Sequence, residues 1–193
     1  MSSTHRHFII HKPHGYLSQF VYNQRQRRNK KKLGDLYDFP EGTMSIGRLD
    51  QNSEGLLLLT TDGKVSEEVR SKKVEKEYYA QVDGLITDEA IEQLQNGVMI
   101  KLPKGNLYET LPCSAARLKE RPSFHKEIRD ERHGPTSWIS ITIREGKFRQ
   151  VRKMTAAVGF PTLRLVRIRI GQIQMDQLQP GKVWEVDEFQ LTS

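Results

Sequence analysis

One stretch organises the whole sequence: residues 47–63, which read GRLDQNSEGLLLLTTDG. Its four consecutive leucines follow Gly55 and end at the turn residues 60–63. An apolar run this short cannot span a membrane, and the bounding turn residues favour a strand that is covered on both faces. The polar residues 50–54 must then form a surface loop at the start of that strand, where a rigid scaffold can hold a functional group still.

Asp50 is the candidate catalytic residue of this loop. A carboxylate at the mouth of a buried strand has the fixed position that catalysis requires. The same residue type also favours turns and caps, because its side chain bonds to nearby backbone groups. From these residues alone, a turn aspartate is the commoner interpretation, and spacing by itself does not identify an enzyme.

The composition favours a polyanionic partner. The chain has 193 residues, a net charge of +7 and a pI near 9.5, a balance that draws a protein to a phosphate backbone or another polyanion. The length suits one compact domain or two small lobes. Cys113 is the single cysteine, which excludes an internal disulfide framework and a cysteine-rich zinc site and fits a reducing cytosol.

Several function classes lack their sequence signals. Residues 1–7 contain no apolar signal core and no window reaches transmembrane length, so we expect a soluble cytoplasmic protein. The glycine-rich phosphate loop and the dinucleotide-binding turn are absent, which argues against nucleotide hydrolysis and dinucleotide redox chemistry. A metal site is the weaker interpretation of the closely spaced histidines, because no cysteine or carboxylate follows them at a familiar spacing. These histidines are His5, His7, His11 and His14.

Strand-like and helix-like segments alternate along the chain, which predicts an α+β fold. Residues 87–97 are the clearest helix, because Thr87 supplies an N-cap, acidic residues fill the first turn and Asn-Gly ends it. Residues 119–135 are rich in charge and proline and should form a surface loop. Strand-type residues occur at 8–11, 79–82, 99–102, 107–118, 137–144, 163–170 and 183–186.

Two basic clusters differ in kind. Residues 25–32 contain six cations and no apolar partner, which fits a solvated loop or a sequence-independent phosphate contact equally well. Residues 149–158 instead predict a helix with a basic and an apolar stripe. The basic stripe is Arg149, Arg152 and Lys153, and the apolar stripe is Val151, Met154 and Val158. Periodicity alone favours a solvated basic face for this helix.

Four segments together resemble a known family. They are residues 12–20 (KPHGYLSQF), 47–63, 76–78 (KEY) and 145–154 (EGKFRQVRKM), the last continuing into 159–167 (GFPTLRLVR). In order and spacing they are similar to the RsuA-like ribosomal RNA pseudouridine synthases, and the resemblance covers roughly residues 8–189. The chain looks most like the RluE branch, which acts on large-subunit 23S rRNA.

The resemblance implies an α+β catalytic domain over residues 8–193, after a flexible segment of residues 1–7. Its mixed, mostly antiparallel sheet is expected to form two lobes around a basic cleft, with helices packed on the sheet. Many family members carry an additional N-terminal S4-type RNA-binding domain, which we do not expect here. Phe148 and Glu77 depart from the residues that relatives commonly have at these positions.

The resemblance also assigns roles to single residues. Asp50 matches the catalytic aspartate, Tyr78 the tyrosine that stacks on the target base, and Arg152 the arginine that pairs with the aspartate. Without the resemblance, Tyr78 would be a core residue and Arg152 part of an ordinary ion pair. Leu165 is expected to wall the uracil pocket, and Lys12 and Arg48 fit either a phosphate contact or loop positioning. The expected RNA-binding residues are Lys12, Arg48, Lys147, Arg149, Lys153 and Arg167.

The predicted function is therefore site-specific isomerisation of a uridine in 23S rRNA, without a cofactor or metal. The expected partner is 23S rRNA or a pre-ribosomal large-subunit intermediate, and the expected state is a monomer. A noncatalytic rRNA-binding or ribosome-assembly factor is the main rival, and it predicts that Asp50 is dispensable. An enzyme of free nucleosides is disfavoured, because a neutral small substrate does not need a basic surface.

Overall fold

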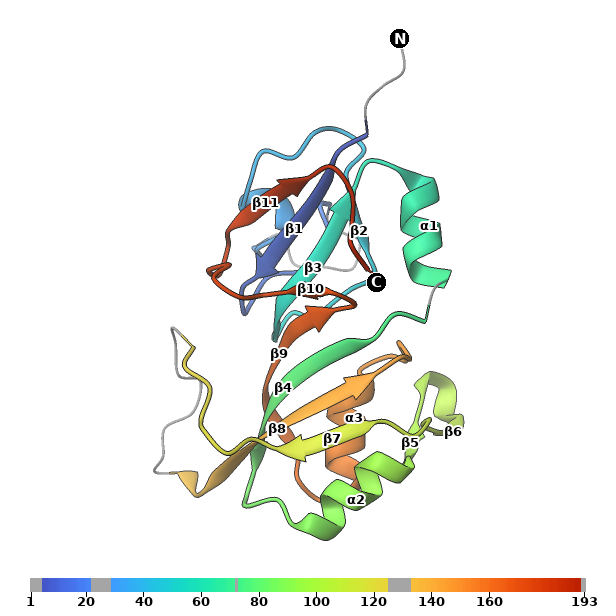
Figure 1. The fold of residues 1–193 in the computed structure, drawn as a ribbon, viewed down its shortest axis with the longest axis vertical. Helices are drawn as coiled ribbons and strands as arrows, with labels where there is room; N and C mark the ends of the chain where they lie inside the picture. Colours follow the sequence, from blue (N-terminus) through green and yellow to red (C-terminus); the bar gives the residue numbers. More distant parts are fainter. Residues whose placement is uncertain (1–4, 22–28, 72, 125–132, 192–193) are drawn as a thin grey trace. The chain divides into compact units, whose positions relative to one another are not determined.

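The chain folds into two compact units in the computed structural model, which describes residues 5–21, 29–71, 73–124 and 133–191 (Figure 1). Unit 1 comprises residues 1–74 and 167–193, and unit 2 comprises residues 75–166. Strand β9 (Thr162–Ile170) begins in unit 2 and ends in unit 1, so the chain returns to its first unit along a single strand.

Unit 1 is built around strand β3 (Ser53–Thr60), in which all eight residues are buried. This confirms the prediction of a strand covered on both faces. The predicted surface loop over residues 50–54 was too long, because Ser53 and Glu54 are buried within the strand. β3 pairs antiparallel with β1 (His7–Lys12) on one side and with the short β2 (Met44–Ile46) on the other. The remaining strands are β10 (Ile173–Gln174), which pairs with β9, and β11 (Val183–Val186), which pairs with β1.

Alternation along β1 and β3 sends side chains to two separate apolar clusters. One cluster contains Phe8, Ile10, Leu33, Leu57 and Leu59, and it is extended by Phe20 and Phe39. The other contains Ile9, Ile46, Leu56, Leu58, Val74, Ile170, Leu178 and Leu191. The strand that carries the candidate loop is therefore held from both faces, as a rigid scaffold requires.

Helix α1 (Gly63–Ser71) follows β3 directly and was not among the predicted elements. Its sequence is polar and offers only Val65 and Val69 as apolar residues, so the hydrophobic pattern that marks most surface helices is weak. The signal that could have found it is Asp62, whose Oδ1 accepts the backbone N–H of Lys64 at 2.8 Å. This bond holds the pKa of the Asp62 carboxyl below its usual value.

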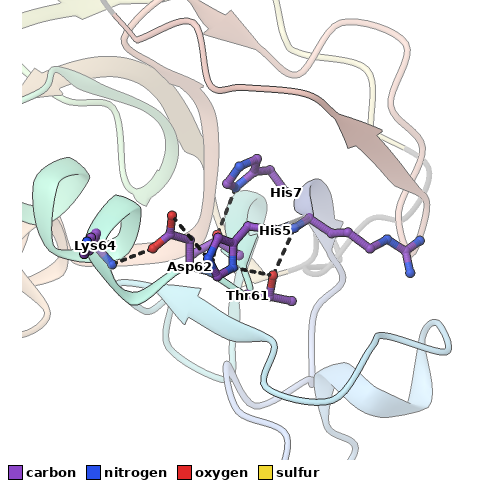
Figure 2. Close-up of polar contacts among 7 residues, drawn as sticks. His5, His7, Thr61, Asp62 and Lys64 are labelled. Atoms are coloured by element: carbon purple, nitrogen blue, oxygen red, sulfur yellow. Dashed lines mark hydrogen bonds and ion pairs between the residues drawn. The ribbon is translucent and has the colours of Figure 1, made fainter. Parts of the chain in front are cut away.

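The start of β1 is fixed beside this helix, as Figure 2 shows. His7 Nδ1 is hydrogen-bonded with Thr60 Oγ1 at 2.9 Å, and His5 lies 3.9 Å from Asp62 and 3.4 Å from Thr61. Both histidines therefore have neighbours that suit a structural role. His11 is also buried, with Nδ1 at 2.7 Å from the carbonyl oxygen of Leu178.

Unit 2 has an antiparallel sheet in which β8 (Thr136–Ile143) lies between β4 (Lys76–Asp83) and β7 (Ser114–Arg117). Helix α2 (Asp88–Asn96) packs against β7, and α3 (Gln150–Ala157) packs near β5 (Met99–Lys101). Thr87 Oγ1 accepts the N–H of Ala90 at 3.2 Å, which confirms the predicted N-cap. The antiparallel pairings of both units confirm the α+β class.

One predicted strand was wrong in extent. Residues 107–118 form two strands, β6 (Leu107–Glu109), which pairs with β5, and β7, which joins the larger sheet. Pro112 lies in the break, where its missing N–H would interrupt a continuous ladder. Thr110 turns inward instead, and its Oγ1 accepts the N–H of Val98 at 2.9 Å. A short 3-10 turn (Pro103–Gly105) connects β5 to β6, and another (Leu33–Asp35) lies in unit 1.

Candidate active site

The loop that carries Asp50 is anchored on both sides of that residue. Before it, Leu49 is buried, and both its N–H and its carbonyl are bonded to the Ser18 hydroxyl, at 3.0 and 2.7 Å. After it, the carbonyl of Gln51 accepts the N–H of Gly15 at 2.8 Å. Ser53 N–H closes the turn on the Asp50 carbonyl at 3.0 Å. Asp50 itself is half-buried, and these bonds fix the backbone on either side of it.

Lys12 is the interior support of the same loop. Its side chain is fully buried, and Nζ donates to the carbonyl oxygens of Pro13 (3.1 Å), Tyr16 (2.7 Å) and Gln51 (3.2 Å). A buried ammonium that serves three carbonyls has no surface to offer a phosphate. Of the two roles predicted for Lys12, a phosphate contact and loop positioning, these contacts favour loop positioning.

Arg167 is a second predicted RNA-binding residue that the structure places inside. It is 5% exposed, and its Nε donates to the Leu56 carbonyl at 2.8 Å. The backbone of Arg167 also lies so close to Gly55 that a Cβ at that glycine would stand 2.2 Å from the Arg167 carbonyl oxygen. Gly55 has φ +104°, so its position in β3 requires glycine for both its backbone conformation and the close approach.

Tyr78 lies in unit 2, on strand β4, opposite Ile141 of β8. It is 8% exposed, so most of its ring is buried. Its neighbour Glu77 points to the other face of the strand, where the carboxylate accepts the hydroxyl of Ser140 at 2.8 Å. That bond gives a local structural role to a residue that departs from the family pattern.

Helix α3 carries Arg152 and confirms the predicted apolar stripe at Val151 and Met154, whereas its third member, Val158, follows the last residue of the helix and is half-buried. Val151 and Met154 are buried, whereas Arg152 and Lys153 are half-buried. Arg152 Nη1 lies 3.5 Å from the Thr162 carbonyl oxygen, a long bond at the limit of the usual range. A shorter bond, 2.7 Å between the Thr155 and Thr162 hydroxyls, ties the helix to β9.

The start of α3 is held by a polar clamp that consists of Glu145 and Gln150. Gln150 is 3% exposed; its Oε1 accepts the N–H of Lys147 at 3.1 Å, and its Nε2 donates to Glu145 at 2.7 Å. The Glu145 carboxylate also accepts the N–H of Leu111 at 3.0 Å and the hydroxyl of Tyr108. That hydroxyl bond, with burial adding to it, raises the pKa of Tyr108 above its usual value.

The clamp shapes the turn that precedes the helix. Arg149 has φ +53°, a left-handed conformation that a non-glycine residue adopts only when its surroundings impose it. Within that turn Lys147 stacks over the Tyr108 ring at 4.5 Å, and Lys153 stacks over Phe148 at 5.0 Å. Phe148, the second departure from the family pattern, thus packs against a cation of the basic stripe.

Three of the six predicted RNA-binding residues are exposed, and a fourth is half-buried. Arg48, two residues before Asp50 in unit 1, is exposed, as are Lys147 and Arg149 in unit 2, whereas Lys153 is half-buried. Of the basic run at 25–32, residues 25–28 lie outside the described part of the chain. At its described end, Lys30 donates to the Gln51 side chain at 3.2 Å.

Sequence reasoning missed the residues that support the site. Ser18, Glu145 and Gln150 lie within quoted motifs, yet a motif does not state which member touches substrate and which holds the backbone. Gln150 follows Lys147 by three residues, a spacing typical of side chains that bond back to the backbone at a helix start. This spacing could have predicted the contact between them.

Neither a metal-binding cluster nor a membrane-spanning helix is found in the described part of the chain. Within residues 5–21, 29–71, 73–124 and 133–191, no three His, Cys, Asp or Glu side chains are grouped as a metal site requires. In the same part of the chain, no helix is long and apolar enough to cross a membrane.

Known proteins are similar to this chain in sequence and in fold. A family model described as RNA pseudouridylate synthase matches residues 6–157. The ribosomal large subunit pseudouridine synthase E of Xanthomonas campestris is 38% identical over 185 residues, which cover 93% of this chain and 94% of that protein. The protein of the same name from Vibrio vulnificus is 38% identical over 92% of this chain and 74% of its own length. A crystal structure of a pseudouridylate synthase has a TM-score of 0.73 at 25% identity, covering 94% of this chain and 70% of its own.

Proposed function

Because this chain belongs to the RNA pseudouridylate synthase family, we propose that it is an isomerase that converts one uridine of large-subunit 23S rRNA to pseudouridine. Support for the large subunit comes from the relatives at 38% identity, whose names specify it. The substrate is 23S rRNA or a pre-ribosomal large-subunit intermediate in the cytoplasm, and a monomer of residues 8–193 acts as one catalytic domain.

The observation that carries the proposal is the fixed loop around Asp50. Pseudouridine formation breaks the bond between uracil N1 and ribose C1′, rotates the uracil and joins C5 to C1′. The C5 proton is lost and N1 gains one, so atoms balance and no oxidant is consumed. An ionised carboxylate next to the ribose serves this reaction either by attacking C1′ or by removing a proton from C2′, and both routes need a carboxylate held in place.

Arg152 and Tyr78 complete the proposed site. A guanidinium beside Asp50 would favour the charged carboxylate and orient it through its planar fork. A uridine inside folded rRNA must leave its stack to react, and Tyr78 would offer a ring to the extruded base. Leu165, which is 5% exposed on β9, supplies an apolar wall. Arg48, Lys147, Arg149 and Lys153 would bind phosphates.

The deciding experiment maps pseudouridine on unmodified 23S rRNA by carbodiimide labelling and primer extension. Wild-type protein should produce one new stop, whereas Asp50→Ala should lower the rate by more than about a thousandfold, the usual scale for an essential catalytic carboxylate. Asp187→Asn, which neutralises an exposed carboxylate of unit 1, is the matched control and should retain full activity. Full turnover by Asp50→Ala would refute the catalytic role and favour an rRNA-assembly factor.

A further inference from the structure

Two adjoining cavities open on one face of the unit 2 sheet, and Gln81 and Trp138 line both of them. The larger has a volume of about 680 Å³ and the smaller about 260 Å³. Gln81 on β4 stands directly opposite Trp138 on β8, so their side chains lie next to each other on the same face. The larger volume falls in the range of about 300–1,000 Å³ that ligand sites occupy.

The walls of these cavities contain polar groups that folding alone does not explain. Trp138 is 7% exposed, and its Nε1 is shielded from solvent without a hydrogen-bond acceptor in the described part of the chain. A shielded donor without an acceptor is rare and costly in native proteins. Gln81 is 5% exposed, and its Nε2 donates to Thr136 Oγ1 at 3.0 Å. The other amide atom, Oε1, therefore faces away from Thr136 and can accept a hydrogen bond.

Aromatic and cationic groups complete the smaller cavity. Phe124 lies 5.6 Å from the Trp138 ring, and the guanidinium of the buried Arg164 stacks over Phe124 at 4.8 Å. Arg121 is exposed and lines both cavities. Arg117 also lines the larger cavity, and it donates to the Ile86 carbonyl and to Asp88.

We propose that these cavities form a subsite for a second, unstacked nucleotide of the RNA substrate, separate from the target uridine. Its base, after a small shift of the walls, accepts a hydrogen bond from Trp138 Nε1 and donates one to Gln81 Oε1. Every RNA base has an acceptor and an N–H donor side by side on its pairing edge, and bases also stack on aromatic rings. Arg121 binds the attached phosphate. This inference rests on the proposed function for the identity of the RNA.

Trp138 itself provides the test. The chain has two tryptophans, and Trp184 is 42% exposed in unit 1, so Trp184→Phe leaves Trp138 as the sole indole reporter. Titration with oligouridylate or oligoadenylate of about 12 nucleotides should quench its fluorescence to saturation. An abasic oligonucleotide with the same number of phosphates should leave the emission unchanged. Equal quenching by the abasic strand would overturn the proposal, because it would show a response to backbone charge alone.

A second variant tests the hydrogen bond proposed for Gln81. Gln81→Met keeps the length of the side chain and removes the acceptor, and it should weaken binding of the same oligonucleotides by about three- to tenfold with an unchanged salt dependence. Gln174→Met, on the exposed part of β10, is the matched control and should bind like wild type. Wild-type affinity in Gln81→Met, with its fold verified by circular dichroism, would also overturn the subsite.

Failure of the subsite and failure of the proposed function give different results. Asp50→Ala in the Trp184→Phe background should quench like its parent, because Asp50 takes no part in the second subsite. If base-dependent quenching occurs while wild-type protein forms no pseudouridine, the isomerase proposal fails and the subsite stands. If pseudouridine forms and quenching does not depend on the base, the subsite fails and the isomerase stands.

Discussion

Replacement of Lys12 by methionine tests how the candidate catalytic loop is held. The ammonium is fully buried and donates to the carbonyls of Pro13, Tyr16 and Gln51, the last of which directly follows Asp50. Methionine fills nearly the same volume as the lysine stem but cannot donate. Lys12→Met therefore removes hydrogen bonds with little change in packing.

The expected loss of stability is about 2–4 kcal/mol. A net contribution of about 1.5–3 kcal/mol is typical for a hydrogen bond to a charged group, and three such bonds end on this ammonium. The sum is not lost in full, because removal of the charge also removes its own cost of burial. For a chain of this length each kcal/mol lowers the thermal midpoint by about 2–4 °C, so the midpoint should fall by roughly 4–16 °C.

The assay compares thermal unfolding, RNA binding and turnover for Lys12→Met and for Lys64→Met, which removes an exposed charge on α1. Lys64→Met should change stability by less than about 0.5 kcal/mol. Well below its midpoint, Lys12→Met should bind RNA with an unchanged salt slope but turn over at least about tenfold more slowly, because its loop no longer fixes Asp50. An unaltered midpoint, together with a salt slope smaller by about 0.7, would refute this reasoning and restore a phosphate contact for Lys12.

Three further predictions concern the scaffold. Gly55→Ala should lower the free energy of unfolding, measured with denaturant, by more than about 3 kcal/mol, because backbone strain at φ +104° adds to an overlap with the backbone of β9. The control Gly63→Ala has open space around its Cβ and should be neutral or slightly stabilising. Burial, aided by a nearby carboxylate, raises the pKa of the Cys113 thiol to about 11, so alkylation at pH 8 should be about a hundredfold slower than for a free cysteine; rapid labelling of folded protein would contradict this. Gln150→Leu should lose about 1–3 kcal/mol by leaving the Lys147 N–H without its acceptor, and an unchanged unfolding midpoint would exclude the clamp.

The fold was predictable wherever local pattern and tertiary packing agree. The Leu56–59 run gave a strand that is buried along its full length, and Thr87 began a helix as expected. The α3 stripe was also correct, because Val151 and Met154 follow the helical period and are buried. In these cases the side-chain pattern is itself the cause of the structure.

The residues that support the candidate site could not be predicted in the same way. Lys12 and Arg167 are basic residues in a basic chain. Nothing near them in the sequence shows that each would be buried with a bond to a carbonyl far along the chain, Gln51 for Lys12 and Leu56 for Arg167. Helix α1 has too few apolar residues to show the helical period in its sequence, and it depends on packing against β2 and β3. Burial of a charge is decided by tertiary contacts, so the sequence limits the candidates for RNA contact without separating them from structural cations.

Lys12 and Gln150 are held by separate sets of contacts, so the effects of replacing them can be compared in a double variant. The bonds described for Lys12 end on unit 1, whereas those of Gln150 end on unit 2. Stability losses at sites without shared partners add to within about 0.5 kcal/mol, so Lys12→Met and Gln150→Leu should be additive in the double variant. Their effects on turnover should not add, because Asp50 and Arg152 are proposed to act on one reaction step, and damage to either already forfeits most of their joint contribution. Additive losses in turnover would show that Asp50 and Arg152 act independently, and would remove the arginine–aspartate pair from the mechanism.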